Sequence, residues 1–337
     1  MTTHGKRITA TVGALALATS LAACGGSSEA GNKKSTGNPA WKKYTFTIGE
    51  QSDGIVQLAE ESGAFDDAPY TIKWAKFEYG PPLVQAAATG DIDLGNVGSV
   101  PPITGAAKDL GFKIVSVQSP LKKHDSSEDI VVPKGSPIKK LADLEGKRVA
   151  VPQGSSAHGL ALNAIQSVGL TPKDVKFVFL PPAEGQAAFS SGKVDAWSIW
   201  DPQASLAVDK GARVIAKGLP PLDYGTSFYV ASNKTLEDKV KRAALADVLK
   251  RIANSYEFGN DNLDVWSKAY AKETGLELDL VKELIKGWRN KLTYVSDEQV
   301  TAGQKLADNF FDAGEITKKV DVPTVVDNIL PKGYDVG

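Results

Sequence analysis

In the first part of the chain, segments whose apolar residues recur at every second position alternate with segments whose apolar residues have helical spacing. Tyr44-Thr-Phe-Thr-Ile48 repeats every second residue, as a half-buried strand does. The segment after it has helical spacing and stops before Gly63, a residue type that often ends helices. Continued in this way, the pattern predicts the order β-α-β-α-β, at residues 44–48, 55–62, 70–77, 83–89 and 92–97. This order is typical of a mainly parallel sheet with helices on its faces.

The same order recurs in the second part, at residues 148–151, 157–168, 175–180, 183–191 and 194–199. Two short matches relate the halves: Gln85-Ala-Ala precedes Gly90-Asp-Ile-Asp93, and Gln186-Ala-Ala precedes Gly192-Lys-Val-Asp195. Chance similarity is the alternative, because glycines that end helices are common. The agreement in element order as well as in residues favours two similar lobes.

Two extended segments, residues 129–133 and 227–232, predict where the chain crosses between the lobes. We therefore expect an α/β protein with two hinged α/β lobes. Lobe one comprises residues 41–130 and 226–337, and lobe two comprises residues 131–225. The pattern is helical after Thr235, with one apolar face formed by Leu245, Val248, Leu249 and Ile252. We expect these C-terminal helices to pack on lobe one.

The first 23 residues have the layout of an export signal, a short basic start followed by an apolar stretch too short to span a bilayer. Cys24, the only cysteine, follows Leu21-Ala-Ala23. This arrangement resembles a bacterial lipoprotein signal, in which the cysteine is lipidated and becomes the first mature residue. An ordinary signal peptide with an incidental cysteine is the alternative.

Residues 24–40 are rich in Gly, Ser, Asn and Lys, which predicts a flexible tether with little to bury. The protein would then be extracytoplasmic, held to the bacterial cell membrane by the lipid on Cys24. It would lie in the periplasm or on the outer face of the cytoplasmic membrane.

Charge and composition exclude several classes of protein. Without the signal, 37 basic residues face 40 acidic ones, a net charge of about −3 that argues against a nucleic-acid binder. His124 and His158 are the only histidines left, far apart in the sequence, so a zinc site is not expected. We expect no metal, no cofactor and a monomer.

Ligands of open α/β sheets bind beyond the carboxyl ends of the strands. Four loops are predicted there, at residues 49–54, 98–102, 152–158 and 200–203, and two facing lobes would bring them to one cleft. The loops offer hydroxyl and amide groups and contain no Lys or Arg, and helices follow them. Such neutral donors suit an anion that accepts many hydrogen bonds. The candidate ligand-binding residues are Gln51, Ser52, Ser99, Gly154, Ser155, Ser156, Trp200 and Asp201.

Several candidates have a structural alternative. Ser155 and Ser156 precede a helix, so one can cap it while the other contacts a ligand. Ser99 precedes Pro101 and could cap the next helix, and Gln51 could be a plain loop residue. We interpret Asp201 as a helix cap in preference to a contact with a cationic group of the ligand, because its charge would repel a simple anion.

Trp197 and Trp200 lie three residues apart on one predicted strand, so they should face opposite sides. Trp200 is nearer the strand's end and is the better candidate for a cleft wall. His158 is interpreted as a buried or capping histidine rather than a catalyst. We expect no catalytic residue, since the chain has no phosphate loop, no G-x-S-x-G and no H-E-x-x-H.

Several segments resemble the periplasmic solute-binding proteins for aliphatic sulfonates, to which nitrate, taurine and thiamine-precursor binding proteins are related. The likeness runs from about residue 44 to about residue 290. The segments are Gly80-Pro-Pro-Leu83, Gly90-Asp-Ile-Asp93, Val132-Pro-Lys-Gly-Ser-Pro-Ile138, Phe179-Leu-Pro-Pro-Ala183 and Val194-Asp-Ala-Trp-Ser-Ile-Trp-Asp-Pro202.

The resemblance implies the two-lobed type II periplasmic-binding-protein fold and a receptor that delivers its ligand to the membrane permease of an ABC importer. It places Gln51, Ser99, Gly154, Ser155 and Trp200 in the loops that line the family's cleft. Two loops depart from the family. The first often reads Gly-Tyr-Gln-Lys but is Gly-Glu-Gln-Ser from residue 49, and Gly-Ser-Val from residue 98 replaces the frequent Gly-Glu-Ala.

The hypothesis is therefore a lipid-anchored binding protein for an aliphatic sulfonate or a similar small organic anion. Taurine, nitrate and a thiamine-type pyrimidine precursor are alternative ligands. A small-metabolite enzyme is the alternative of another class, since the fold alone does not exclude one. An anchored adhesion or scaffold protein is a third reading.

Overall fold

The computed structural model describes residues 38–52, 54–122 and 127–336. The expected signal, Cys24 and most of the expected tether lie outside the described residues. Regular structure begins with the short helix η1 (Pro39–Lys43), which includes the last two residues assigned to the tether. Within the described ranges no helix is both long and apolar enough to cross a membrane.

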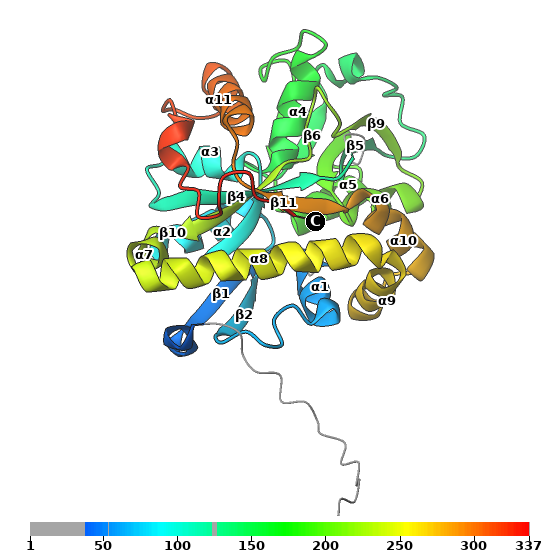
Figure 1. The fold of residues 1–337 in the computed structure, drawn as a ribbon. Coiled ribbons are helices and arrows are strands. Elements are labelled where there is room, and N and C mark those ends of the chain that lie inside the picture. The colour runs from blue at the N-terminus through cyan, green and yellow to red at the C-terminus, as the bar shows by residue number, and fades with distance from the viewer. Residues whose placement is uncertain (1–37, 53, 123–126, 337) are drawn as a thin grey trace, which may run out of the picture. The chain divides into compact units, whose positions relative to one another are not determined.

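The strands form two sheets (Figure 1). The seven-stranded sheet has the order β12-β11-β4-β10-β3-β1-β2, and with its helices we call it lobe one. Its strands are β1 (Thr45–Glu50), β2 (Thr71–Lys76), β3 (Leu94–Gly98), β4 (Phe112–Pro120), β10 (Ser227–Ser232), β11 (Asn290–Thr293) and β12 (Asp335–Val336).

The five-stranded sheet has the order β7-β6-β8-β5-β9, and with its helices we call it lobe two. Its strands are β5 (Glu128–Val132), β6 (Arg148–Val151), β7 (Lys176–Phe179), β8 (Ala196–Trp200) and β9 (Arg213–Lys217). The expectation of mainly parallel sheets is wrong, because both sheets are mixed. The parallel part of each is a trio, β2-β1-β3 in lobe one and β7-β6-β8 in lobe two, and the other strand pairs are antiparallel.

The repeat seen in the sequence corresponds to these two trios, which have the same strand order. Asp93 and Asp195, the aspartates of the two matched segments, make one contact in common. The Asp93 carboxylate accepts a hydrogen bond from the Thr47 N–H (2.9 Å) in β1, and the Asp195 carboxylate accepts one from the Arg148 N–H (2.8 Å) in β6. Each aspartate lies directly before the last strand of its trio in chain order and joins it to the first, β3 to β1 in lobe one and β8 to β6 in lobe two.

The two crossing segments are strands of the sheets. β10 lies beside β3 in lobe one, and β5 lies beside β8 in lobe two. The division expected between residues 130 and 131 therefore falls inside one strand, and β5 belongs as a whole to the sheet of lobe two. The sheet to which β5 belongs is decided by its pairing with strands distant in the sequence, and a local pattern does not show that pairing.

Helices cover both sheets. Those of lobe two are α4 (Ser156–Gln166), α5 (Pro182–Ser190) and α6 (Gln203–Asp209), with the short η2 (Leu141–Leu144). Those of lobe one include α1 (Gly54–Ser62), α2 (Gly80–Thr89), α3 (Pro101–Ala106), α7 (Asn233–Glu237), α8 (Lys239–Asp261), α9 (Leu263–Thr274), α10 (Leu278–Gly287) and η3 (Val322–Val325). The predicted apolar face of α8, from Leu245 to Ile252, is fully buried in the core that includes Phe46 and Ile48 of β1.

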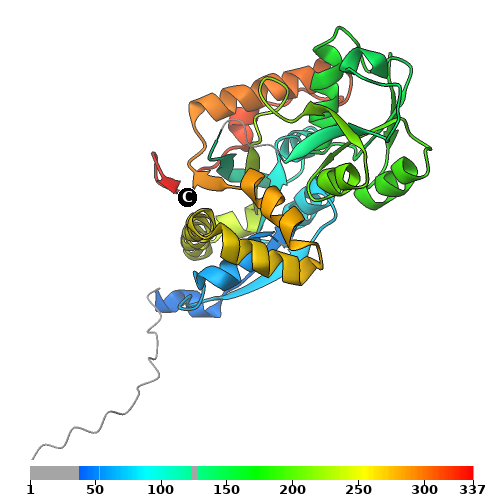
Figure 2. The ribbon, with the colours of Figure 1, turned by 90° about the vertical axis from the view of Figure 1, so that its right-hand side faces the viewer.

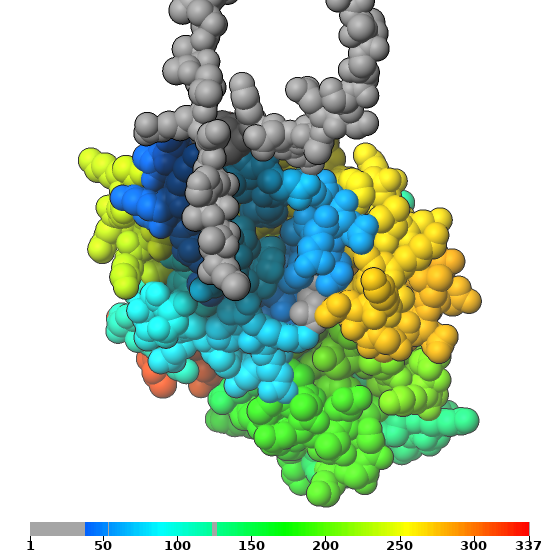
Figure 3. Space-filling view, turned by 90° about the horizontal axis from the view of Figure 1, so that it is seen from below, coloured from blue at the N-terminus to red at the C-terminus, as the bar shows by residue number. Residues whose placement is uncertain are grey.

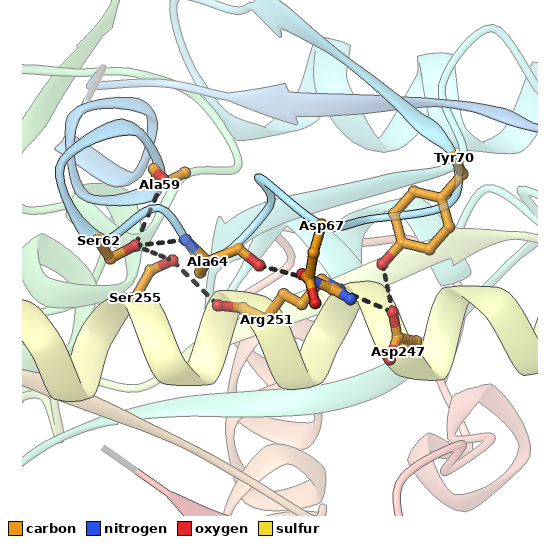
Figure 4. Close-up of polar contacts among 8 residues, drawn as sticks. All are labelled: Ala59, Ser62, Ala64, Asp67, Tyr70, Asp247, Arg251 and Ser255. Atoms are coloured by element: carbon orange, nitrogen blue, oxygen red, sulfur yellow. Dashed lines mark hydrogen bonds and ion pairs between the residues drawn. The ribbon is translucent and has the colours of Figure 1, made fainter. Parts of the chain in front are cut away.

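A polar network holds α8 to the segment between α1 and β2 (Figure 4). The Arg251 guanidinium donates to the carboxylates of Asp67 (2.5 Å) and Asp247 (2.8 Å) and to the carbonyl oxygen of Ala64 (2.6 Å). Tyr70 donates its hydroxyl hydrogen to Asp247 (2.7 Å). Burial and these carboxylate contacts make the network a fixed part of lobe one.

The last α-helix, α11 (Asp297–Asp312), differs from the expectation for the C-terminal helices because it packs on both lobes (Figures 1 and 2). Phe310 lies in one cluster with Val100 before α3 and Leu162 in α4. The Asn309 amide donates to the side chains of Asn163 (3.0 Å) and Gln166 (2.9 Å) in α4. α11 thus connects lobe one to lobe two away from the sheets.

Candidate functional site

A cavity of about 160 Å³ lies between the lobes. Residues at the carboxyl ends of β1, β3 and β8 line it, among them Glu50, Gly98 and Trp200. This is the position at which open α/β sheets bind ligands. Since typical drug-sized ligands occupy pockets of roughly 300–1,000 Å³, the volume suits a molecule of few atoms.

Six of the eight expected residues line this cavity: Gln51, Ser52, Ser155, Ser156, Trp200 and Asp201. Trp200 is half-buried at the cavity, whereas Trp197 is buried in the core of lobe two, so the two tryptophans divide as their spacing predicts. A role of the six residues in binding stays a prediction.

Ser99 does not belong to the cavity. Gly98 lines the cavity, but Ser99, one residue later, lines a separate small apolar hollow with Pro102 and Phe228. Ser99 also does not cap the next helix. That helix, α3, begins at Pro101 with Val100 at its N-cap, and no side chain caps it.

Gly154 also lies outside the cavity lining. Its φ of +72° places it in the left-handed region, which favours glycine. Its N–H donates to Nδ1 of His158 (3.3 Å). The glycine therefore shapes the turn that precedes α4, and its backbone is committed to a histidine of the protein.

The two serines at the start of α4 use their hydroxyl hydrogens within the protein. Ser155 is the N-cap: its Oγ accepts from the His158 N–H (3.3 Å) and donates to the carbonyl oxygen of Pro152 (2.7 Å). Ser156 donates to the carboxylate of Glu128 in a short hydrogen bond. We expected one of these serines to cap the helix and the other to contact a ligand. Ser155 is the cap, but Ser156 contacts a carboxylate of the protein itself.

Asp201 accepts hydrogen bonds from the N–H (3.0 Å) and the hydroxyl (2.7 Å) of Ser205 in α6. It therefore satisfies donors of the first helical turn, as a cap does, although Pro202 occupies the N-cap position. Burial raises the pKa of Asp201, against the lowering effect of the bonds from Ser205.

Several residues that line the cavity were not predicted from the sequences of the four loops. Asn96 and Gln118 lie on strands, Glu128 lies on the crossing strand β5, and Trp266 lies in α9 and Trp288 directly after α10. Trp266 and Trp288 reach the cavity through the packing of the C-terminal helices on lobe one, with ring centroids 6.3 Å apart. Only a polar residue next to a predicted strand end, such as Asn96, carried a local signal.

The lining of the cavity includes acidic side chains. Glu50, Glu128 and Asp201 line it, and among the described lining residues none is Lys, Arg or His. Burial, and next the charge of Asp223, raise the pKa of Glu128 well above the ordinary range of a carboxyl group. Burial, and next the charge of Asp201, raise the pKa of Asp129 to about 7.

The lobes touch beside the cavity, where the green surface of lobe two meets the blue and cyan surface of lobe one (Figure 3). The N–H of Ala183, in the first turn of α5, donates to the Glu78 carboxylate (2.9 Å). A Cβ added to Gly98 would lie 2.6 Å from both Cβ and Oγ of Ser156. The cavity wall therefore depends on close approach of the two lobes.

His158, in the first turn of α4, is buried, as expected, and contacts α11. Its ring packs edge-on against Phe177, Phe179 and Phe310, with centroids 5.2–5.6 Å apart. Its Nε2 lies 3.4 Å from the Glu315 carboxylate. Burial lowers the pKa of His158 to about 4, which keeps the ring neutral at pH 7.

Comparison with known proteins decides the family. The family model described as NMT1/THI5 like matches residues 58–262. This chain belongs to that family. Within the described residues, no group of three or more His, Cys, Asp or Glu side chains is placed to hold a metal ion.

Among relatives of this NMT1/THI5-like protein, the taurine-binding periplasmic protein of Escherichia coli (strain K12) is 32% identical over 259 residues, 73% of this chain and 74% of the relative. The alkanesulfonate-binding protein SsuA from Xanthomonas axonopodis pv. citri, solved bound to MOPS, is 30% identical with a TM-score of 0.77, covering 84% of this chain and 98% of that one.

The periplasmic aliphatic sulphonate binding protein SsuA from Escherichia coli is 31% identical with a TM-score of 0.73, covering 87% of this chain and 95% of that one. The NMT1/THI5-like chain thus has the two-lobed type II fold of periplasmic binding proteins. It is an extracytoplasmic solute-binding protein of an ABC importer and not an enzyme.

Proposed function

We propose that the protein binds an aliphatic sulfonate in the cavity between its lobes and delivers it to the membrane permease of an ABC importer. The observation that carries the proposal is a small cavity lined from both lobes by neutral polar side chains, among them Gln51, Asn96 and Gln118. A sulfonate stays charged at neutral pH and its three oxygens accept several hydrogen bonds, so neutral donors can hold it without a full counter-charge.

The relatives support the same class of ligand. Two of the solved relatives bear the names of sulfonate-binding proteins, and one of them was solved with MOPS. MOPS is a sulfonate that also carries an amine nitrogen. Taurine, nitrate and a pyrimidine precursor remain the competing ligands for the same cavity.

The chain also has the elements of a lipid anchor. Cys24 follows Leu21-Ala-Ala23 at the end of the apolar stretch, and about fifteen residues without long apolar side chains separate it from η1. A lipid on Cys24 would keep the receptor near its permease, so that ligand released by lobe opening enters the permease.

A thermal-shift screen of the full chain tests the proposal. A ligand at a hundred times its dissociation constant stabilises the folded protein by about 2.7 kcal/mol, which we expect to raise the unfolding midpoint by about 5 °C. The panel contains alkanesulfonates, aminoalkanesulfonates, sulfate, nitrate and a pyrimidine. Stabilisation by nitrate or the pyrimidine with no response to any sulfonate would refute the proposal.

A further inference from the structure

Two buried tyrosines of lobe one are linked by hydrogen bonds to a glutamine of the cavity. The hydroxyl of Tyr256, in α8, donates to Oε1 of Gln118 on β4 (2.8 Å). The hydroxyl of Tyr229, on β10, lies 3.0 Å from that of Tyr256. Tyr229 is 1% exposed and Tyr256 is 6% exposed, whereas Gln118 is half-buried and lines the cavity. The three side chains therefore form a hydrogen-bonded chain from the core of lobe one to the cavity.

The count of hydrogens in this chain fixes the orientation of the Gln118 amide. Each tyrosine has one hydroxyl hydrogen. Tyr256 uses its hydrogen on Gln118, so Tyr229 donates to Tyr256, and both hydrogens have acceptors. If the amide were turned over, Nε2 would donate to Tyr256, and one tyrosine hydrogen would have no acceptor within the described residues. Leaving a buried donor unsatisfied costs free energy, so the tyrosines hold the amide in the first orientation.

This orientation makes Gln118 a donor toward a ligand. Its Oε1 is occupied by Tyr256, and the two hydrogens on Nε2 are left for another acceptor. Because the side chain lines the cavity, that acceptor can be an oxygen of a bound anion.

Two further donors of lobe one lack acceptors. The Trp266 side chain is 2% exposed and lines the cavity, and its Nε1 has no hydrogen-bond partner within the described part of the chain. The same holds for the buried Nδ2 of Asn96 on β3. An oxyanion would satisfy both donors and offset the cost of their burial. In lobe two, by contrast, Ser155 and Ser156 use their hydroxyl hydrogens within the protein.

We infer that Gln118, Asn96 and Trp266 bind the oxyanion of the ligand through their side-chain N–H groups. Tyr229 and Tyr256 are positioning residues that hold the Gln118 amide with its N–H groups toward the ligand. This inference rests on the proposed function and assigns the residues of the same site that recognise the anion. Three neutral donors suit a sulfonate, whose three oxygens accept hydrogen bonds. All five residues belong to lobe one, so this lobe holds the anionic end of the ligand.

Calorimetry of the full chain with butanesulfonate tests the donors. Gln118→Met keeps an unbranched side chain and removes the amide, and we expect at least tenfold weaker binding. Trp266→Phe keeps an aromatic ring and removes the N–H group, and we expect at least threefold weaker binding. Thermal unfolding shows that each variant is folded. Unchanged affinity in both variants would overturn the inference.

A double-mutant cycle tests the positioning role of Tyr256. Tyr256→Phe removes only the hydroxyl, so the amide can turn and present its oxygen to the ligand. Butanesulfonamide, a neutral analogue with an N–H group, would accept that change, whereas butanesulfonate would not. We expect the preference for butanesulfonate over butanesulfonamide to fall at least threefold. In the Gln118→Met background, Tyr256→Phe should leave the preference unchanged. An equal effect in both backgrounds would show that Tyr256 does not act through Gln118.

Tyr70→Phe is the matched control for Tyr256→Phe. Tyr70 is 7% exposed and donates its hydroxyl hydrogen to Asp247 (2.7 Å), outside the cavity lining. We expect both variants to lower the unfolding midpoint and only Tyr256→Phe to change the preference. The same change of preference in Tyr70→Phe would contradict the positioning role. Failure of every sulfonate to bind the natural protein would refute the proposed function itself, whereas full affinity in Gln118→Met and Trp266→Phe would refute this inference alone.

Discussion

Gly98 at the end of β3 and Ser156 at the start of α4 meet so closely that only a hydrogen fits between them on the glycine side. A Cβ at residue 98 would lie 2.6 Å from the Cβ and Oγ of Ser156. The two residues belong to different lobes, and both line the cavity. Their contact fixes how near the lobes come to each other at the ligand.

The substitution Gly98→Ala should therefore hold the lobes apart. We expect ligand affinity to fall at least tenfold with little change in the unfolding midpoint, because each lobe keeps its own core. Calorimetry and thermal unfolding measure the two quantities. Gly303→Ala in α11 is the control, since its Cβ would make an ordinary 3.4 Å contact with Val322. Unchanged affinity in Gly98→Ala would show that the contact does not limit binding.

His158 should make the fold sensitive to mild acid. Its pKa is about 4 in the folded protein and about 6.5 in the unfolded chain. The unfolded chain therefore binds the proton between these values, and stability falls as the pH falls. Between pH 7 and pH 5 this group should cost about 2 kcal/mol. Urea unfolding of the protein and of His158→Gln at both pH values isolates the effect.

Glu315, whose carboxylate lies 3.4 Å from Nε2 of His158, acts in the opposite direction. Burial raises its pKa, so its contribution favours the folded state at low pH and is lost as the pH rises. It is present in both proteins and cancels in the comparison with His158→Gln. If the natural protein instead gained stability over the variant on acidification, a charged His158–Glu315 pair would be forming and the account of a neutral ring would be wrong.

Arg251 should contribute to stability and not to binding. It joins α8 to Asp67 and to the Ala64 carbonyl oxygen, away from the cavity lining. We expect Arg251→Met to lower the free energy of unfolding by about 1–3 kcal/mol, because the side chain is largely buried and leaves charged partners behind. Denaturant unfolding measures this loss.

Arg148→Met is the matched control for that variant. Arg148 also pairs with an aspartate, Asp195, but both side chains are about one third or more exposed. Exposed ion pairs contribute little, so the control should lose less stability. A larger loss in Arg148→Met, or a change in ligand affinity in Arg251→Met, would contradict the role assigned to the network.

Cys24→Ser tests the anchor separately from the receptor. We expect the variant to appear in the soluble extracytoplasmic fraction and to support less uptake, with an unchanged dissociation constant. Cell fractionation and calorimetry give the two results, and Ser28→Ala in the tether should stay with the membrane. A weaker dissociation constant in Cys24→Ser would assign the anchor a structural role.

The order of elements could be predicted from the sequence because periodicity is local. The repeat around Asp93 and Asp195 reflected a real correspondence between the lobes, since both aspartates bind the first strand of their trio. The mixed character of the sheets could not be read, because β5 and β10 pair with strands distant in the sequence. The hydrophobic pattern of a strand indicates neither which strand it pairs with nor whether the two run parallel or antiparallel.

The residues that line the cavity could be predicted only in part, again because a local pattern does not show long-range contacts. Loops at strand ends gave Gln51, Ser156 and Trp200, whereas Ser99 turns to the other side one residue beyond Gly98. Trp266 comes from helices that were expected only to brace lobe one. The full lining of the cavity arises from tertiary packing, which no single segment shows.

The central claim is that the cavity recognises a sulfonate, and a calorimetric titration of the full chain with butanesulfonate and pentanoate tests it most directly. The two share the four-carbon chain and differ in sulfonate against carboxylate. We expect a dissociation constant near micromolar for the sulfonate, about −8 kcal/mol, and at least tenfold weaker binding of the carboxylate. No binding of the sulfonate, or tighter binding of pentanoate, would contradict the claim.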